Sequence, residues 1–415
     1  MKKIRLGIFG AGRGMRLSGA FQMIDALEVV AICDNHKQRR ETALKHLGSD
    51  VASYESFDEF IEHPMDAVLL ANNFHQHAPY AIRCMEKGLH VLSECLVNGT
   101  MGEGVALVRA FEKSNVIYMI AENTPQMIFN REIKRIADGG TLGKVVYAEG
   151  EYNHPVDVWD TKFTQNYKFY PNHWRNFLPS TYYITHSLGS VMYVTGATPK
   201  RVSAIAMYAP NEGEVPNASY NADIAANIFT VNDDGSMFRV TACSQFGGGH
   251  NSSRVCGTKG QVENIRGTDD KIMLRYNTWN VPEGAEEKKM YVPEWNDRDE
   301  ELIKKSDHGG ADFLTVRLFV DCVLANKQPP RPFDIYSATV MSSVAILGHR
   351  SVLDGGRFYD IPDFRREEDR TFYENDYLTP FWGDDGSAPT IPCCSNPDYK
   401  PTEIQMELYL KELEK

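Results

Sequence analysis

Two side chains near the middle of the chain have types and a spacing suited to proton transfer. Tyr183 and His186 are three residues apart, so a helix through them would place both on one face. Oxidation of a secondary alcohol needs a base for the hydroxyl proton and an acceptor for the hydride. His186 can take that proton directly or orient Tyr183 to do so. We therefore predict both as catalytic residues; the alternative is a helix pair packed in the core.

The first forty residues carry the pattern of a dinucleotide-binding unit, which would supply the hydride acceptor. Buried strands are predicted over residues 4–9 and 28–33, a glycine turn over 10–14, and a helix from Met15 to about residue 26. Strand, glycine turn, helix, strand and terminal acid, in this order, indicate a βαβ unit that holds phosphates at the start of its helix. The alternative is an ordinary βαβ unit with a glycine turn.

Within this unit the small and acidic residues have separate tasks. Gly10 allows the turn, and Gly12 lets the backbone approach a pyrophosphate. Asp34 can accept hydrogen bonds from ribose hydroxyls, and it favours NAD because a 2′-phosphate would meet a like charge. The third small residue of the motif would fall at Met15, whereas a glycine stands one position earlier. The predicted cofactor residues here are Gly10, Gly12, Arg13, Gly14 and Asp34.

Alternating helices and strands continue to about residue 124. Helices are predicted over 37–47, 57–61, 78–87 and 101–114, and strands over 66–71, 90–92 and 116–121. This alternation predicts an α/β Rossmann domain with a doubly wound parallel sheet, whose ligands bind beyond the carboxyl ends of the strands. That edge adds four predicted cofactor residues: Asn72, His77, Glu94 and Asn123.

The sequence changes character after Gly140. Strands are predicted over 145–152, 200–208, 224–231, 236–245 and 260–265, and helices over 179–195, 310–326 and 335–353. These elements predict an α+β domain with a large open, mainly antiparallel sheet, suited to a substrate wall or an oligomer surface. We expect a cofactor domain at 1–124, a substrate domain at 125–365 and a C-terminal arm at 366–415. We also expect a homo-oligomer formed through the open sheet.

Five side chains of this second region are predicted to bind substrate: His154, Trp174, Arg175, His308 and Asp312. His154 ends the first strand of the second domain. Trp174 offers a ring for stacking against a sugar, and Arg175 offers hydrogen-bond donors. His308 begins a helix after an acidic loop, where Asp312 can cap the helix or bind sugar. The nearby aromatic residues are expected to pack as a loop; they are Phe163, Tyr167, Phe169 and Tyr170.

Length and composition exclude several classes of protein. A chain of 415 residues predicts two domains and a tail. A net charge of −12 without a lysine or arginine run argues against a nucleic-acid partner, and no apolar run reaches membrane-spanning length. Because Met1 lies directly before the first strand, no signal peptide is expected, and we predict a cytoplasmic protein. The eight cysteines lack zinc-site spacing, so no metal is predicted.

The loops at the sheet edge resemble those of the glucose–fructose oxidoreductase / inositol dehydrogenase / MocA family. That family usually carries Thr-Pro-x-x-x-His after its fourth strand and Glu-Lys-Pro after its fifth. Here residues 72–77 keep only His77, and residues 94–96 keep only Glu94. The resemblance implies NAD and a Rossmann domain followed by an open sheet. Cys95 stands where the family has its catalytic lysine, and it carries no charge to polarise an oxygen.

The second domain is similar to a branch of that family, glycoside hydrolase family 109. The similar stretches keep their order; they are 174–175, 183–189, 308–313 and 361–364. The resemblance covers about residues 1–365 and implies that NAD stays bound while a glycoside is cleaved by transient oxidation. In that route a C3 ketone acidifies the C2 proton, a second base removes it and the C1 substituent leaves. Water addition and reduction then complete the hydrolysis.

We therefore expect an NAD-dependent oxidoreductase that acts on a sugar or glycoside by hydride transfer at C3. Three alternatives stay open. The first is an NAD-dependent glycosidase that works by oxidation, elimination, water addition and reduction. The second is a metal-dependent 3-keto-glycoside lyase or hydratase, and the third is a non-catalytic regulator that binds NAD or sugar.

Overall fold

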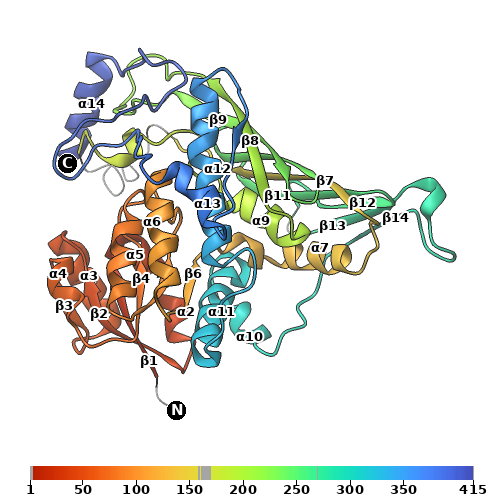
Figure 1. The fold of residues 1–415 in the computed structure, drawn as a ribbon, viewed down its shortest axis with the longest axis horizontal. Coiled ribbons are helices and arrows are strands. Elements are labelled where there is room, and N and C mark those ends of the chain that lie inside the picture. The colour runs from red at the N-terminus through yellow and green to blue at the C-terminus, as the bar shows by residue number, and fades with distance from the viewer. Residues whose placement is uncertain (1–2, 158, 160–169, 269, 415) are drawn as a thin grey trace.

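The computed structural model describes residues 3–157, 159, 170–268 and 270–414, in which two sheets organise the chain (Figure 1). The first has six parallel strands in the order β3-β2-β1-β4-β5-β6. The second has nine strands in the order β14-β13-β12-β11-β7-β10-β9-β8-β15, antiparallel except where β7 pairs with β10. The predicted α/β domain followed by an α+β open-sheet domain is confirmed. Phe163, Tyr167 and Phe169 lie outside the described residues.

The first sheet is built from short buried strands with helices on both faces. All four residues of β4 are buried, as expected for a central strand of a parallel sheet. The strands are β1 (Ile4–Phe9), β2 (Leu27–Cys33), β3 (Ala52–Tyr54), β4 (Ala67–Leu70), β5 (His90–Ser93) and β6 (Tyr118–Ile120). The helices are α1 (Ala11–Gly14), α2 (Ser18–Gln22), α3 (Lys37–Leu47), α4 (Phe57–Phe60), α5 (His77–Glu86) and α6 (Met101–Glu112).

The glycine turn is tighter than predicted. Instead of a turn over 10–14 and a helix from Met15, α1 begins directly after Gly10, and a 3₁₀ turn, η1 (Met15–Leu17), links it to α2. Gly10 has φ +100°, and a Cβ there would lie 2.2 Å from the carbonyl oxygen of Ala71. A Cβ on Gly14 would lie 2.5 Å from Cγ2 of Ile8. Gly14 therefore provides the close packing of helix on strand that the motif assigns to its third small residue.

The second sheet contains more strands than the sequence indicated. Its strands are β7 (Val145–Asn153), β8 (Pro199–Tyr208), β9 (Asp223–Asn232), β10 (Met237–Ser244), β11 (His250–Gly257), β12 (Gly260–Asn264), β13 (Ile272–Tyr276), β14 (Lys288–Tyr291) and β15 (Tyr359–Asp360). Strands β11, β13, β14 and β15 were not predicted from the sequence. The first of these, β11, is largely polar, and β15 has only two residues, so neither shows the apolar alternation of a half-buried strand.

Helices on one face of this sheet connect it to the first domain. They are α7 (Ile128–Asp138), α9 (Thr185–Thr195) and α12 (Ile335–Leu353), whereas α11 (Ala311–Ala325) packs against α2 of the first domain. α9 packs on β7, β10 and β11, whereas α12 contacts β8 on one side and α6 and β6 on the other (Figure 1). A Cβ on Gly150 in β7 would lie 2.6 Å from the carbonyl oxygen of Ser187, so this glycine lets α9 lie directly on the sheet. Our domain limits at residues 124 and 365 remain a proposal.

The C-terminal arm folds back onto its own chain. It contains α13 (Glu367–Arg370) and α14 (Glu403–Leu413), with irregular structure between them. The carbonyl oxygen of Asp376 accepts a hydrogen bond of 2.7 Å from the backbone N–H of Gly102, at the start of α6. The arm also contacts the second domain, where the backbone N–H of Asn217 donates to the carbonyl oxygen of Gln405 in α14 (Figure 1). No helix among the described residues is long and apolar enough to cross a membrane.

Candidate active site

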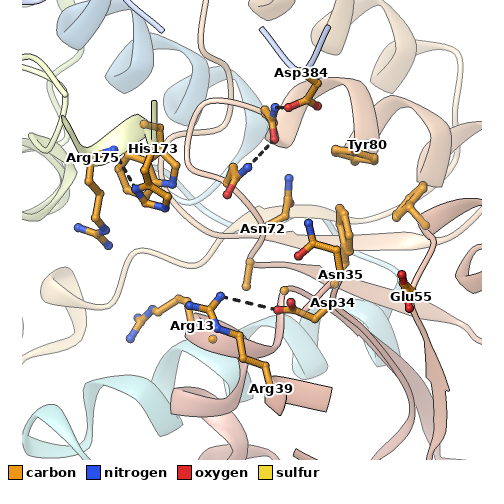
Figure 2. Close-up of a pocket in the computed structure, with 18 residues that line it drawn as sticks. Arg13, Asp34, Asn35, Arg39, Glu55, Asn72, Tyr80, His173, Arg175 and Asp384 are labelled. Atoms are coloured by element: carbon orange, nitrogen blue, oxygen red, sulfur yellow. Dashed lines mark hydrogen bonds and ion pairs between the residues drawn. The ribbon is translucent and has the colours of Figure 1, made fainter. Parts of the chain in front are cut away.

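Two adjoining cavities lie beyond the carboxyl ends of the first sheet's strands. The larger, of about 500 Å³, is lined by the glycine turn, by the residues after β2 and β4, and by residues 173–175 (Figure 2). The smaller, of about 190 Å³, adds residues that follow β5 and β6 and residues at the start of α9. Residues that line both include Gly12, Arg13, Asn72, Trp174 and Arg175. The two cavities therefore form one continuous site.

The structure places most of the predicted site residues at these cavities. The larger cavity is lined by Gly10, Gly12, Arg13, Asp34, Asn72, Trp174 and Arg175. The smaller cavity is lined by His77, Glu94, Asn123, Tyr183, His186 and His308, besides the shared residues. Three predicted residues line neither cavity: Gly14, His154 and Asp312. Gly14 packs against β1, His154 is exposed, and Asp312 is buried behind His308.

Asp34 ties the end of β2 to the start of α1. Its Oδ2 accepts a hydrogen bond of 2.8 Å from the backbone N–H of Ala11, and its Oδ1 accepts one of 2.8 Å from the backbone N–H of His36. Arg39 lies nearby, with Nη1 3.9 Å from Oδ2 (Figure 2). Each carboxylate oxygen has a second lone pair, so Asp34 can hold the turn and still accept a hydroxyl at the cavity wall.

Two side chains that line the cavities have buried polar atoms that are free to bind a ligand. Neither polar atom of the Asn72 amide has a hydrogen-bond partner within the described chain, and neither does Nε2 of His77. Nδ1 of His77 lies 2.5 Å from the carbonyl oxygen of Leu96, so Nδ1 carries the proton and Nε2 is an acceptor. Burial lowers the pKa of His77 to about 4, which keeps it neutral. These atoms, with the glycine turn, fit the polar groups of a dinucleotide.

An ion pair stands where the two cavities meet. Nε of Arg13 donates to Oε1 of Glu94 over 2.8 Å. Burial raises the pKa of Glu94, although the positive charge of Arg13 opposes that rise. The charge of Glu94 raises the pKa of Arg13. Glu94 therefore fixes the guanidinium of Arg13, and its role at the cofactor site stays a prediction.

His186 is held by a carboxylate that was not predicted from the sequence. Glu122 follows β6 and is fully buried, and its Oε1 lies 2.7 Å from Nδ1 of His186 at the start of α9. The backbone N–H of Thr124 donates to the same oxygen over 3.0 Å. Burial acts to raise the pKa of Glu122, but the charge and hydrogen bond of His186 outweigh it and lower the pKa to about 2. Glu122 is therefore ionised at neutral pH.

We predicted that Tyr183 and His186 share one helical face. This prediction is wrong, because α9 begins only at Thr185. Residues 179–184 form turns, in which the N–H of Tyr182 donates to the carbonyl oxygen of Pro179. The two rings nevertheless meet, with centroids 5.3 Å apart at 65°. Burial raises the pKa of Tyr183, so its phenol stays protonated and acts as a hydrogen-bond donor.

A stack of aromatic rings forms one wall of the smaller cavity. Phe74 lies 5.1 Å from Trp174 and 5.9 Å from Tyr183 between ring centroids, and Tyr183 lies 6.0 Å from Tyr152. The guanidinium of Arg175 lies 4.4 Å from the centroid of Trp174. Phe74 thus covers one face of the Trp174 ring. The structure does not bring His154 into the cavity, although its ring lies 5.8 Å from that of Tyr152.

A second pair of histidine and carboxylate lies at the same cavity. Nδ1 of His308 is 2.7 Å from Oδ2 of Asp312, and Nδ2 of Asn123 donates to Oδ1 of Asp312 over 2.6 Å. The hydrogen bond with Asp312 raises the pKa of His308. Asp312 therefore positions His308. We predicted that Asp312 binds substrate, but it does not line the cavity. Asn123 lines the smaller cavity, but its amide N–H₂ is directed to Asp312.

Cys95 lies beside Glu122 and is not a nucleophile. Its Sγ donates to Oε2 of Glu122 over 3.3 Å. Burial, with the charges of Glu122 and Glu94, raises the thiol pKa well above its usual value. Cys95 therefore stays protonated at neutral pH. Within the described ranges, His, Cys, Asp and Glu side chains form no group of three or more that could hold a metal ion.

Family models match three stretches of the chain. The NAD-binding Rossmann domain of the GFO/IDH/MocA oxidoreductase family matches residues 4–122, and the GFO/IDH/MocA C-terminal domain matches 130–263. The C-terminal domain of glycosyl hydrolase 109 matches residues 218–371. Together these matches extend over both sheets.

Curated relatives and solved structures agree with these matches. A glycosyl hydrolase family 109 protein of Shewanella pealeana is 24% identical over 401 residues, covering 88% of this chain and 86% of the relative. An alpha-N-acetylgalactosaminidase of Shewanella oneidensis is 24% identical over 402 residues, with the same coverage.

Two solved structures show the same fold. A levoglucosan dehydrogenase in complex with NADH and L-sorbose has a TM-score of 0.72 at 17% identity, covering 88% of this chain and all of that one. The aldose–aldose oxidoreductase of Caulobacter crescentus has a TM-score of 0.68 at 18% identity, covering 87% and 100%. With the glycine turn, Asp34 and the unpartnered atoms of the larger cavity, these matches show that the chain is an NAD-binding member of the GFO/IDH/MocA oxidoreductase family, related to glycosyl hydrolase family 109.

Proposed function

We propose that the protein oxidises a secondary hydroxyl of a sugar or glycoside, at C3, by hydride transfer to NAD. The observation that carries this proposal is the Glu122–His186 pair at the cavity that adjoins the cofactor site. A carboxylate–imidazole pair is the usual arrangement for a base that must take a hydroxyl proton near neutral pH. Bound NAD accepts the hydride and can return it.

The hydrogen bonds assign a role to each nitrogen of His186. Nδ1–H donates to Glu122, so Nε2 keeps a lone pair and acts as the base. The ionised Glu122 stabilises the imidazolium that forms when His186 takes the proton. Tyr183 keeps its own proton and donates a hydrogen bond to the substrate oxygen. Base and donor thus come from neighbouring positions of the second domain.

The walls of the smaller cavity suit a carbohydrate. Aromatic rings can pack against the C–H faces of a sugar, and Arg13 and Arg175 offer several N–H donors to its oxygens. The solved relatives bound to L-sorbose and levoglucosan support the same class of substrate. C3 as the oxidised position remains part of the proposal.

A second candidate function is cleavage of a glycoside through transient oxidation. The pair His308–Asp312 favours it, because elimination needs another base for the C2 proton. The match to the C-terminal domain of glycosyl hydrolase 109 supports it as well.

The two functions differ in their products. For a dehydrogenase, sugars should give one NADH per sugar oxidised, measured at 340 nm. A redox glycosidase should release the aryl group from aryl glycosides without added cofactor and with loss of a C2 deuterium. In that case His308→Asn should abolish aryl release and leave NADH formation intact, whereas His186→Ala should abolish both. No NADH from any sugar, with no aryl release, would favour a non-catalytic regulator.

We also infer that the open sheet forms a homo-oligomer. Gly150 faces α9, so its neighbours Glu149 and Glu151 face away from the helices. Arg239 lies 3.3 Å from Glu149, and Arg266 lies 2.9 Å from Glu151. Paired charges on an open sheet face can form the centre of an interface between two copies. Light scattering of the wild type and of Arg239→Glu tests this inference, because only the variant should dissociate.

A further inference from the structure

The C-terminal arm reaches the cofactor cavity. Nε2 of Gln76, just before α5, donates to Oδ1 of Asp384 over 2.6 Å, although 308 positions separate the two residues. Gln76 is itself oriented, because its Oε1 accepts a hydrogen bond of 3.0 Å from Nδ2 of Asn73. The ring of His75 stacks on Phe381 with centroids 4.5 Å apart. His75 and Gln76, two consecutive residues of one loop, thus hold the arm, and Asn73 of the same loop orients Gln76.

This part of the arm is a wall between two cavities. Asp384, Gln76 and Tyr80 line the cofactor cavity, and the same three residues line a further cavity of about 500 Å³ between α5, α6 and the arm. Figure 2 shows Asp384 on the side of the cofactor cavity opposite Asp34, with Asn72 between them. Without this loop the two cavities would merge and the cofactor cavity would be open on that side.

The loop 381–384 lies outside the parts of the chain that the family models match. Those matches end at residue 371, whereas the loop spans 381–384. Further along, Arg350 in α12 holds the arm through Nη2, which lies 2.6 Å from Oδ1 of Asp376. The loop is therefore supported from α12 and from the start of α6, and it does not depend on the Gln76 contact alone for its position.

We propose that the loop 381–384 is part of the NAD site, with Asp384 as its outer wall, and that the Gln76–Asp384 hydrogen bond retains the cofactor. A carboxylate accepts hydrogen bonds from hydroxyl and amino groups, both of which NAD carries. Release of NAD requires this bond to break and the loop to move. Interactions of this kind act on dissociation more than on association.

The experiment measures the rate at which NADH leaves the full-length protein. NADH-loaded protein is mixed with excess NAD, and the loss of bound-NADH fluorescence is followed. Asp384→Ala should release NADH about five- to tenfold faster than the wild type, as expected for the net loss of one hydrogen bond. Gln76→Glu, which places a like charge against Asp384, should have the same effect. Asp398→Ala removes one exposed charge elsewhere in the arm and should change the rate less than twofold.

Hydrogen–deuterium exchange gives a readout that does not depend on a variant. In the wild type, NAD should slow exchange in peptides that contain residues 381–384 as well as in those that contain the glycine turn. Protection of the glycine turn without protection of the loop would overturn the proposal. Equal release rates in Asp384→Ala and Asp398→Ala would also overturn it.

Discussion

Nδ1 of His186 lies 2.7 Å from Oε1 of Glu122, although the two residues are 64 positions apart and belong to parts of the chain that build different sheets. Glu122 follows the strand β6 of the cofactor domain, whereas His186 lies in the first turn of α9, a helix that packs on the second sheet. The contact therefore joins His186 to the edge of the Rossmann sheet, next to the cofactor cavity. This relationship leads to the first prediction.

Glu122→Gln should lower kcat for sugar oxidation about 100-fold. The glutamine keeps the shape of the side chain but removes the charge that stabilises the imidazolium, and general-base catalysis of this kind contributes 10²–10⁴ to the rate. The bound NAD measured after denaturation should not change, because Glu122 does not line the cofactor cavity. An unchanged kcat would show that His186 works without Glu122.

Tyr183→Phe should lower kcat about tenfold and leave the pH dependence of kcat unchanged below pH 9. Burial raises the pKa of Tyr183, so the hydroxyl donates a hydrogen bond throughout this range and does not titrate. Loss of one hydrogen bond is expected to cost about 1 kcal/mol, or somewhat more in a dry site. If the substitution instead removed the rising limb of the pH profile, Tyr183 would be the base.

Gly10→Ala should abolish NAD binding and destabilise the fold by more than about 3 kcal/mol. Its Cβ would lie 2.2 Å from the carbonyl oxygen of Ala71, and its φ of +100° is also unfavourable for alanine. Gly48 provides the control, since it has φ +104° but no atom within 4 Å of a Cβ. Gly48→Ala should therefore cost only its backbone strain, about 1–3 kcal/mol, and should leave NAD binding intact. Chemical denaturation and the NAD content of both variants test this difference.

The protein should lose stability as the pH falls from 7 to 5, in part through His349. Burial lowers the pKa of His349 to about 4, whereas the unfolded chain binds the proton near pH 6.5. Between these values the unfolded state binds more protons, so acid favours unfolding, by about 2 kcal/mol at pH 5 for this residue. Nε2 of His349 lies 2.7 Å from the carbonyl oxygen of Pro392, and a glutamine can donate to the same oxygen.

His349→Gln should therefore reduce the difference in unfolding free energy between pH 7 and pH 5 by about 2 kcal/mol. Urea denaturation at both pH values measures it. His46→Gln on the surface of α3 is a suitable control and should leave the difference as in the wild type. A full pH dependence in His349→Gln would assign acid sensitivity to other groups, such as the buried His77.

The sequence predicted the cofactor domain well, because its signals are local. The glycine turn, the terminal acid Asp34 and the buried strands each depend on neighbouring residues. The edge residues Asn72, His77 and Glu94 could be predicted together, because the carboxyl ends of parallel strands meet at one edge. The role of Gly14 was within reach as well, but only the packing against Ile8 shows it.

Only one member of the Glu122–His186 pair could be predicted from the sequence. His186 was recognisable as a candidate, but its carboxylate comes from the end of a strand in another domain, and no local pattern joins them. The position of Tyr183 on a helix was wrong because residues 179–184 form turns before α9 begins. Strand β11 was not predicted because its residues are mostly polar. They lie in a sheet whose second face is charged, so the strand lacks the usual alternation of apolar and polar residues.

Because Gly150 has no side chain, strand β7 determines how closely α9 lies on the sheet, although this glycine does not line the cavity. Here the backbone of the strand lies against the carbonyl of Ser187, one residue after His186. With His186 in the role of base that we propose, its distance from the cofactor depends on how closely α9 lies on the sheet. Gly150→Ala would push α9 away from the sheet and so alter the proposed reaction, while every residue that lines the cavity stays the same.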